Sequence, residues 1–416
     1  MKAGYNDMRC GLIGEHLSHS FSAPIHNELA DYSYELFELE PKDVEEFVKN
    51  GELDAFNVTI PYKKTVIPFL DEISDEAKAI GAVNTIVRDK DGKLHGYNTD
   101  YFGFSYMIEH AELDVKGKKA VVLGRGGASL TVCTVLRDRG AREIAVFSSR
   151  DNTPENLAAH TDAEIIVNAT PVGMYPNNLL SPIDITAFKK CECVLDLIYN
   201  PARTKLMLDA EALGIKAVNG LSMLVAQAAK AFEYFTGDKA EDGAVERITS
   251  SISQKCQNIV LIGMPGCGKS TVGKIIAEKL GRSFYDADDE FLSMHGISPA
   301  ECIEKLGEPR FRELESVTVK ELGKQSGTVI ATGGGVVTRN ENYQPLHQNG
   351  VIFFIERKLD NLASGGRPLS QRTSPEQMYN SRIAAYRRFA DNVIYSNEVP
   401  DDTAKKIIDG YHLLLK

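Results

Sequence analysis

Short runs of apolar residues, many of them β-branched, recur along the chain, and amphipathic helical patterns separate them. We predict strands over residues 9–14, 119–124, 143–147 and 259–262, because each run is largely apolar and ends at a glycine or a polar turn. Strands that alternate with helices are typical of folds with parallel sheets covered by helices. The sequence therefore predicts an α/β protein.

The length and the charge pattern indicate more than one domain. A chain of 416 residues exceeds what one hydrophobic core usually organises. The formal net charge of −11 is uneven: residues 255–416 carry 21 Lys and Arg against 20 Asp and Glu, whereas residues 1–254 carry 26 against 38. We therefore expect a first domain over residues 1–254 and a second over 255–416.

The composition excludes several classes of protein. With 43% hydrophobic and 25% charged residues, and with no apolar run long enough to cross a bilayer, the chain is typical of a globular protein that does not enter the membrane. The first residues do not form a signal-peptide pattern, and seven cysteines in this length do not make a disulfide framework. We expect a cytoplasmic protein with reduced thiols. Its acidic balance argues against a nucleic-acid partner.

The run at 258–271 predicts a nucleotide site. An apolar strand leads into Gly263, Gly266 and Gly268, and an amphipathic helix follows, so the run contains the pattern G-x-x-x-x-G-K-[ST]. Glycines let backbone N–H groups converge on phosphates, and the helix N-terminus favours the same negative charge. Lys269 is placed to reach the outer phosphates, and the hydroxyl of Ser270, which precedes Thr271, can bind Mg²⁺. This part of the chain is expected to bind ATP or GTP.

A second glycine-rich turn follows the predicted strand over 119–124. It contains Gly124, Gly126, Gly127 and Ala128, and a helix and another strand complete a βαβ unit that can receive the pyrophosphate of a dinucleotide. The second strand ends in Ser149 and Arg150, which suit the 2′-phosphate of NADP, where an NAD enzyme would have an acidic residue. The adjacent Asp151 keeps NAD open as an alternative.

Polar residues also recur where the predicted strands of the first half end. They are Ser20, Ser22, Asn57, Thr59, Lys63, Asn84 and Asp100. In open α/β sheets ligands bind at strand ends, although ordinary roles such as helix capping by serines, a capping aspartate or a solvated lysine are alternatives. Gln227, within an apolar helix, is equally explained as a buried structural amide.

Taken together, these blocks resemble shikimate dehydrogenase from residue 9 to about residue 250. The resemblance implies a substrate part over residues 1–103 and 228–254, and a Rossmann-like NADP part over 104–227. It implies that Ser20 and Ser22 hold the substrate carboxylate. It also implies a ketone reduction, which needs a proton donor and a local cation, and Lys63 can supply both while Asp100 orients it. The substrate hydroxyls would be bound by Asn57, Thr59, Lys63, Asn84, Asp100 and Gln227, with Tyr199 nearby, and Thr170 and Met174 would border the nicotinamide.

Two alternatives accompany this resemblance. One is a quinate/shikimate dehydrogenase that uses NAD, and the other is a first half that no longer catalyses and regulates the second by binding shikimate. Tyr101 keeps the second alternative open, because glycine follows the aspartate in the family and added bulk beside Asp100 would narrow the pocket. Intact Lys63 and Asp100 argue against it.

The second half contains further polar blocks after its nucleotide motif. Asp286 and Asp288 follow a predicted strand at alternate positions, so we expect both carboxylates to point the same way. The later blocks contain Arg312, Gly334 and Gly335, then a polar segment over 360–376 with Arg367 that we interpret as a lid, and Arg382 on the following helix. Surface ion pairing is the alternative for each arginine.

These blocks resemble shikimate kinase from about residue 256 onward. The resemblance implies that Asp286 supports Mg²⁺, that Asp288 accepts the proton of the attacking hydroxyl, and that Arg367 neutralises charge on the transferred phosphoryl group. Arg312 and Arg382 would hold the substrate carboxylate, with Arg387 or Arg388 as alternatives to Arg382. Gly334 and Gly335 would offer backbone amides.

The product of the first reaction is the substrate of the second, so the two resemblances support each other. We expect a bifunctional enzyme of aromatic amino-acid biosynthesis that reduces 3-dehydroshikimate with NADPH and phosphorylates shikimate with Mg-ATP. The expected fold is a two-part dehydrogenase followed by a P-loop kinase fold. The sequence carries no signal for an oligomeric state.

Overall fold

The computed structural model describes residues 4–17, 20–362, 374–396 and 399–415. The chain forms two compact units, and each is described here by itself. The first comprises Met1–Val172, Leu180–Tyr199 and Asp209–Thr249, and the second comprises Gly173–Leu179, Asn200–Leu208 and Ser250–Lys416. The main break along the chain therefore falls between Thr249 and Ser250, inside helix α9 (Ala244–Cys256).

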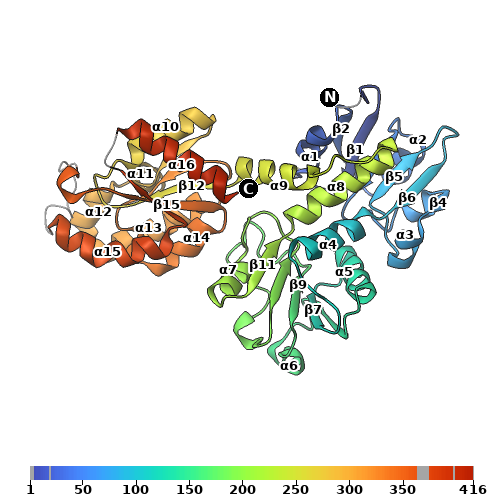
Figure 1. The fold of residues 1–416 in the computed structure, drawn as a ribbon, viewed down its shortest axis with the longest axis horizontal. Coiled ribbons are helices and arrows are strands. Elements are labelled where there is room, and N and C mark those ends of the chain that lie inside the picture. Colours follow the sequence, from blue (N-terminus) through green and yellow to red (C-terminus); the bar gives the residue numbers. More distant parts are fainter. Residues whose placement is uncertain (1–3, 18–19, 363–373, 397–398, 416) are drawn as a thin grey trace. The chain divides into compact units, whose positions relative to one another are not determined.

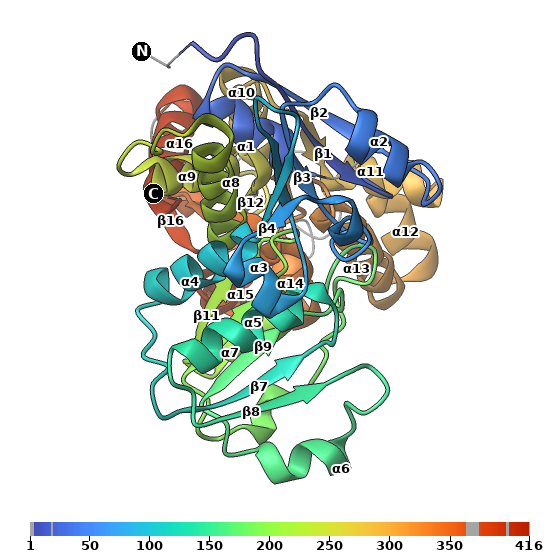
Figure 2. The same ribbon diagram turned by 90° about the vertical axis from the view of Figure 1, so that its right-hand side faces the viewer.

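The first unit begins with a mixed sheet of order β2-β1-β3-β5-β6-β4. Its strands are β1 (Arg9–Gly14), β2 (Ser33–Glu38), β3 (Ala55–Val58), β4 (Glu72–Ile73), β5 (Thr85–Arg88) and β6 (Leu94–Tyr97). Strands β1, β2 and β3 run parallel (Figure 2). Strand β5 is antiparallel to both β3 and β6. The helices of this part are α1 (Ser22–Leu29), α2 (Val44–Asn50) and α3 (Asp75–Ile80).

A second, fully parallel sheet of order β11-β10-β9-β7-β8 completes the first unit. Its strands are β7 (Lys119–Leu123), β8 (Glu143–Phe147), β9 (Ile165–Asn168), β10 (Cys193–Asp196) and β11 (Lys216–Asn219). The associated helices are α4 (Thr99–His110), α5 (Gly127–Asp138), α6 (Pro154–Leu157), α7 (Lys205–Ala212) and α8 (Leu221–Thr236). Helices α4 and α8 pack along each other (Figure 1).

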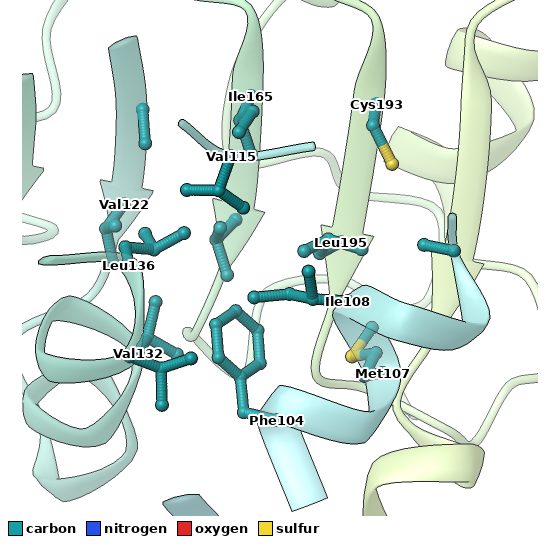
Figure 3. Packing of buried hydrophobic residues seen from close by; sticks show 14 of the residues in the cluster. Phe104, Met107, Ile108, Val115, Val122, Val132, Leu136, Ile165, Cys193 and Leu195 are labelled. Carbon is teal, nitrogen blue, oxygen red and sulfur yellow. The ribbon is translucent and has the colours of Figure 1, made fainter. Parts of the chain in front are cut away.

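Apolar side chains from α4 and α5 cover one face of this second sheet. Phe104 and Ile108 of α4 lie with Val132 and Leu136 of α5 against Val122 and other strand residues (Figure 3). All five strand positions of β7 are buried. Because a parallel sheet is covered on both faces, its strands are continuous apolar runs, which is the pattern that the sequence presents at 119–124.

The second unit is built on a parallel sheet of order β13-β14-β12-β15-β16. Its strands are β12 (Asn258–Ile262), β13 (Phe284–Asp286), β14 (Val329–Ala331), β15 (Gly350–Glu356) and β16 (Asn392–Tyr395). Its helices, beside the end of α9, are α10 (Lys269–Leu280), α11 (Ala287–His295), α12 (Pro299–Leu306), α13 (Glu308–Gly323), α14 (Tyr343–His347), α15 (Pro375–Phe389) and α16 (Pro400–Leu414). Short 3₁₀ turns lie at Ile67–Phe69, Ala158–His160, Ile185–Ala187, Val336–Thr338, Asn340–Asn342 and Leu359–Asn361 in the two units.

Strand β12 supplies both faces of this sheet with core residues. Val260 and Ile262 pack with residues of α13, α14 and α15, while Ile259 and Leu261 pack with residues of α10 and α16. Alternate side chains of a strand point to opposite faces, so one apolar run serves two cores. The architecture confirms the predicted fold class of an α/β chain with a Rossmann-like sheet and a P-loop unit.

Candidate functional sites

Lys63 and Asp100 form an ion pair in the first unit. Lys63 follows β3, and Asp100 lies in the first turn of α4. Its Oδ2 is 2.5 Å from Nζ of Lys63. The lysine and aspartate side chains are only 19% and 11% exposed, so this is not a solvated surface pair. A lysine held in this way can donate a proton while its charge stays close to a reacting oxygen.

Asn84 holds the other oxygen of that carboxylate. Its Nδ2 donates to Oδ1 of Asp100 at 2.9 Å, and its own Oδ1 accepts from the backbone N of Thr99 at 2.7 Å. Both carboxylate oxygens of Asp100 thus have a defined partner, one cationic and one amide. Asn98 takes the N-cap position of α4, accepting from the backbone N of Tyr101, so Asp100 is not the capping residue.

Tyr101 does not lie against this pair in the way that its position suggests. Its hydroxyl donates to Oδ2 of Asp138 on α5 at 2.9 Å, and its ring packs against the core between α4, α5 and the second sheet. Consecutive residues on a helix point in different directions, so the bulk of Tyr101 is directed away from Asp100. This removes the observation that favoured a first half without catalysis.

The remaining predicted substrate residues have more varied surroundings. Ser22 is buried at the start of α1 and donates its backbone N–H to Oγ of Ser20, and neither serine caps α1 from the N-cap position, which is Phe21. Thr59 follows β3, and its backbone N donates to Ile13. Tyr199 packs on the ring of Phe21, with centroids 5.2 Å apart.

Gln227 and Asn57 already have protein partners. Oε1 of Gln227 accepts from Oγ1 of Thr99 at 3.2 Å, and its Nε2 donates to the carbonyl of Leu224. The Asn57 amide donates both of its hydrogens within the protein, to Oγ1 of Thr85 and to the carbonyl of Asn84. These two amides therefore join the network around Asp100 as structural members.

The turn after β7 is open to a pyrophosphate. A Cβ on Gly124, whose φ is +117°, would lie 2.7 Å from the carbonyl oxygen of Ala169, so only glycine fits there. At Gly126 and Gly127 an added Cβ would meet nothing within 4 Å, which leaves the backbone N–H groups at the start of α5, including that of Ala128, approachable. The residues present therefore fit the pyrophosphate of a dinucleotide.

Asp151 does not stand free at the end of β8. One of its oxygens accepts from the backbone N and the Oγ of Ser148, and the other lies 2.6 Å from Nη2 of Arg125. The hydrogen bond from Ser148 and the Arg125 guanidinium hold the pKa of Asp151 below its usual range. Ser149 and Arg150 are exposed beside it. The acidic residue that kept NAD open is thus engaged by neighbours.

The two residues predicted to border the nicotinamide differ in their surroundings. Oγ1 of Thr170 donates to Oδ1 of Asn168 at 2.7 Å, which fixes the turn after β9. Met174 is 43% exposed and belongs to the short segment Gly173–Leu179 that is counted with the second unit.

In the second unit, the glycine-rich turn precedes α10 as predicted. Gly263, Gly266 and Gly268 all have positive φ, and a Cβ on Gly263 would lie 2.6 Å from the carbonyl oxygen of Ile355. Lys269 is buried, and its Nζ donates to the carbonyl oxygens of Gly263 and Met264 at 2.9 and 3.1 Å. The lysine thus lies across the turn that would receive phosphates.

One cavity of about 320 Å³ brings most of the predicted kinase residues together. Of those predicted from the sequence, its lining contains Gly266, Gly268, Lys269, Ser270, Thr271, Asp286, Asp288, Arg312, Gly334, Gly335 and Arg382. Nucleotide-motif residues and predicted substrate residues therefore share one space. Arg367 lies outside the described residues.

Asp286 and Ser270 fit a Mg²⁺ ion. Oγ of Ser270 is 2.5 Å from Oδ2 of Asp286. Among the residues that the structure describes, no group of three or more His, Cys, Asp and Glu could hold a metal. Mg²⁺ at nucleotide sites is usually held by one or two protein oxygens together with phosphates and water, so the hydroxyl and the carboxylate are a suitable donor pair.

The geometric reason given for pairing Asp286 with Asp288 was wrong. The strand β13 ends at Asp286, which caps α11, and Asp288 lies in the first helical turn, where its backbone N donates to Oδ1 of Asp286. The two side chains line the same cavity, but they do so because a helix begins between them and not through strand alternation.

Arg312 is held by two glutamates, neither of which the sequence had indicated. Its Nη1 donates to Glu315 at 2.7 Å and its Nη2 to Glu308 at 3.1 Å. Glu315 is buried in the cavity wall, and burial raises its pKa. The i, i+3 spacing of arginine and glutamate on a predicted helix was the available signal.

The second predicted carboxylate clamp, Arg382, reaches the cavity from α15. Its Nη1 donates to the carbonyl of Gly334 at 3.1 Å, and the hydroxyl of Tyr386 donates to the same oxygen. Arg387 instead lies 3.8 Å from Glu356, and neither Arg387 nor Arg388 lines the described cavity. Of the three alternatives, Arg382 is the one placed at the site.

Comparisons with known proteins match a family to each half of the chain. Residues 12–86 match the shikimate dehydrogenase substrate binding domain, residues 220–248 the shikimate 5′-dehydrogenase C-terminal domain, and residues 265–411 shikimate kinase. A shikimate dehydrogenase (NADP⁺) of Clostridium perfringens is 42% identical over 271 residues, which cover 59% of this chain and 98% of that protein.

Solved structures give the same result for the first half. A chorismate mutase/shikimate 5-dehydrogenase fusion protein from Clostridium acetobutylicum is 36% identical, with a TM-score of 0.54 over 58% of this chain and 95% of that chain. A shikimate dehydrogenase in complex with NADP⁺ is 33% identical, with a TM-score of 0.52 over 60% and 96% of the two chains.

The predicted cofactors NADP(H), ATP and Mg²⁺ agree with these matches. Among the described residues, no helix has both the length and the apolar character needed to cross a membrane. Through residues 12–248 the chain belongs to the shikimate dehydrogenase family, and through residues 265–411 it carries a shikimate kinase domain, so that it is a bifunctional enzyme of the shikimate pathway.

Proposed function

We propose that the first half reduces 3-dehydroshikimate to shikimate with NADPH, and that the second half phosphorylates shikimate to shikimate 3-phosphate with Mg-ATP. The observation that carries the first part is the partly buried Lys63–Asp100 pair, whose carboxylate also accepts from Asn84. An ammonium that is shielded and oriented in this way suits a site where an alkoxide develops.

Each residue of the first site has a separate role in the reduction. NADPH supplies the hydride when it is bound. Lys63 holds the proton at Nζ and delivers it to the carbonyl oxygen of the substrate, while Asp100 fixes that ammonium and accepts from a substrate hydroxyl. Ser20 and Ser22 bind the carboxylate.

The residues of the second site likewise have separate roles in the phosphorylation. Mg-ATP supplies the phosphoryl group, with the glycine-rich turn, Lys269, Ser270 and Asp286 holding it. Asp288 accepts the proton of the attacking hydroxyl, and Arg312 and Arg382 bind the carboxylate of shikimate through guanidinium groups suited to that planar partner.

Two variants in crossed assays test both halves. Lys63→Ala should lower NADPH oxidation with 3-dehydroshikimate by about 10² to 10⁴-fold, because general-acid help is lost, and should leave phosphorylation of added shikimate unchanged. Lys269→Ala should do the reverse, abolishing phosphorylation while NADPH oxidation continues. Wild-type reduction in Lys63→Ala would reject the role of the lysine, and a wild-type protein inactive with 3-dehydroshikimate would reject the proposed reaction.

A further inference from the structure

A chain of buried hydrogen bonds leads from Tyr34, on strand β2, to the Lys63–Asp100 pair. The hydroxyl of Tyr34 donates to Oδ1 of Asn57 at 2.7 Å, and both residues are buried. Sequence analysis gave Tyr34 no role. A buried tyrosine has to satisfy its hydroxyl, and here that hydroxyl bonds to a residue of the site region.

The orientation of the Asn57 amide follows from its other neighbours. Its Nδ2 donates to the carbonyl of Asn84 at 3.3 Å and to Oγ1 of Thr85 at 3.0 Å. A carbonyl can only accept, so the NH₂ end of Asn57 must face it and the oxygen end must face Tyr34. Without the tyrosine hydroxyl, that buried oxygen would lose a donor, which is unfavourable.

Thr85 connects the Asn57 amide to the side chain of Asn84. Its hydroxyl accepts from Asn57 and therefore has its single hydrogen free to donate, and Oδ1 of Asn84 lies 3.1 Å away. With Oδ1 of Asn84 fixed, its Nδ2 faces Asp100 at 2.9 Å, and the other oxygen of Asp100 holds Lys63. The Thr85 hydroxyl also lies 3.1 Å from Oγ1 of Thr99, and the backbone N and Oγ1 of Thr99 bond to Oδ1 of Asn84 as well, so Thr85 and Thr99 orient the Asn84 amide together.

The ring of His26 packs against the ring of Tyr34 and holds it in place. His26 stacks on it with centroids 3.9 Å apart and an angle of 9° between the planes, and Nδ1 of His26 lies 2.6 Å from the hydroxyl of Tyr32. Burial lowers the pKa of His26 to about 3, so the ring is neutral and adds no charge near Asp100. Tyr32 contacts the same histidine but has no hydrogen bond to Asn57 in the described structure.

We propose that Tyr34 is a positioning residue of the reductase site, which acts through Asn57, Thr85 and Asn84 to hold Asp100 against Lys63. This inference rests on the proposed function of the first half. It adds a residue of β2, outside every motif of the sequence, to the set on which reduction depends.

The test compares Tyr34→Phe with Tyr32→Phe in the full-length protein. Each change removes one buried hydroxyl beside His26, so both should lower the melting temperature. Only Tyr34→Phe should lower kcat for reduction of 3-dehydroshikimate, by about tenfold, with KM for NADPH unchanged. Tyr32→Phe should keep kcat within about twofold of wild type. Equal effects of the two variants on kcat would overturn the inference and make Tyr34 a purely structural residue.

A second pair of variants applies if Tyr34→Phe does not fold. Thr85→Val removes the connecting hydroxyl at nearly constant shape and should lower kcat, whereas Thr85→Ser keeps the hydroxyl and should restore it. Retained kcat in Thr85→Val would overturn the inference.

Exchange of the Asn84 side-chain amide protons, measured by NMR, should accelerate in Tyr34→Phe and Thr85→Val only. This measurement does not need turnover. A wild-type protein that fails to reduce 3-dehydroshikimate would reject the proposed function. Unchanged exchange of the Asn84 amide protons in the two variants would reject the positioning role.

Discussion

An acidic residue near each cofactor site of this protein is held by an arginine, and the pairing decides what the acid can do. Asp151 is bound by Arg125 and Ser148, and Glu315 is bound by Arg312. An acidic residue whose oxygens already accept hydrogen bonds competes poorly for ribose hydroxyls. The consequence for the first site is a preference for the cofactor that carries a phosphate.

This preference can be tested with two arginine variants. Arg150→Ala should raise KM for NADPH by about 10 to 100-fold, because one hydrogen bond to a charged phosphate contributes about 1.5–3 kcal/mol, and should change KM for NADH little. Arg125→Ala should weaken NADPH less and improve NADH, because it frees Asp151 for the ribose hydroxyls. The measurement is KM for both cofactors in each variant. Equal losses for NADPH and NADH in Arg150→Ala would make that arginine structural.

At the scale of elements, the strands that form parallel sheets were the most predictable. The runs at 9–14 and 143–147 coincide with β1 and β8, and those at 119–124 and 259–262 differ from β7 and β12 by one residue at an end. Strand β2, which carries Tyr34, was not identified, because most of its residues are exposed and its sequence lacks a continuous apolar run.

Loops whose conformation depends on tertiary partners were the least predictable elements. The strand β13 stops at Asp286 because that residue caps α11, and this start of a helix is what brings Asp288 to the cavity. Tyr34 acquires its proposed role from Asn57 on another strand, and spacing along the chain does not specify that contact. Motifs with a fixed local geometry, such as the turn before α10, were found because sequence determines that geometry directly.

The loop after β14 offers a prediction at this scale. A Cβ on Gly335 would lie 2.2 Å from both Nη atoms of Arg312, and the φ of Gly335 is −105°, which alanine accepts. Gly335→Ala should therefore displace Arg312 and raise KM for shikimate in the kinase reaction by about 10-fold or more, since charged hydrogen bonds are worth about 1.5–3 kcal/mol. KM for ATP should stay near the wild-type value.

The control for this change is Gly410→Ala on α16, which is not among the residues lining the cavity. It should leave both KM values unchanged. A Gly335→Ala enzyme with wild-type KM for shikimate would show that Arg312 does not bind the substrate carboxylate.

At the scale of the whole molecule, each half contains its own core and its own site. The residues that line the kinase cavity all follow residue 264, and the Lys63–Asp100 network lies entirely in the first unit. The families of both halves were evident from the sequence because their motifs occur as ordered blocks. The position of the boundary was harder to derive, since charge changes near residue 255 whereas a continuous helix, α9, runs through the region.

The end of α9 belongs structurally to the second unit. Oγ of Ser250 donates to the carbonyl of Leu415 at 2.6 Å, and Nδ1 of His412 lies 2.9 Å from Oε1 of Gln254. Arg282 also donates to the carbonyl of Gln254, and Ile252 is buried. A kinase fragment that begins at the predicted boundary lacks residues that hold α16 and the turn after α10.

We therefore expect two kinase fragments to differ in stability but not in activity. A fragment of residues 244–416 keeps α9 whole, whereas 256–416 loses at least three hydrogen bonds at about 1 kcal/mol each, which corresponds to a melting temperature lower by roughly 6–12 °C for a domain of this size. Both should phosphorylate shikimate, because every residue of the cavity is present in each.

Ser250→Ala in the longer fragment should reproduce about a third of the loss in melting temperature. Equal melting temperatures would place the boundary after Lys255, and two inactive fragments would show that the kinase depends on the segments Gly173–Leu179 and Asn200–Leu208, which only the full chain supplies.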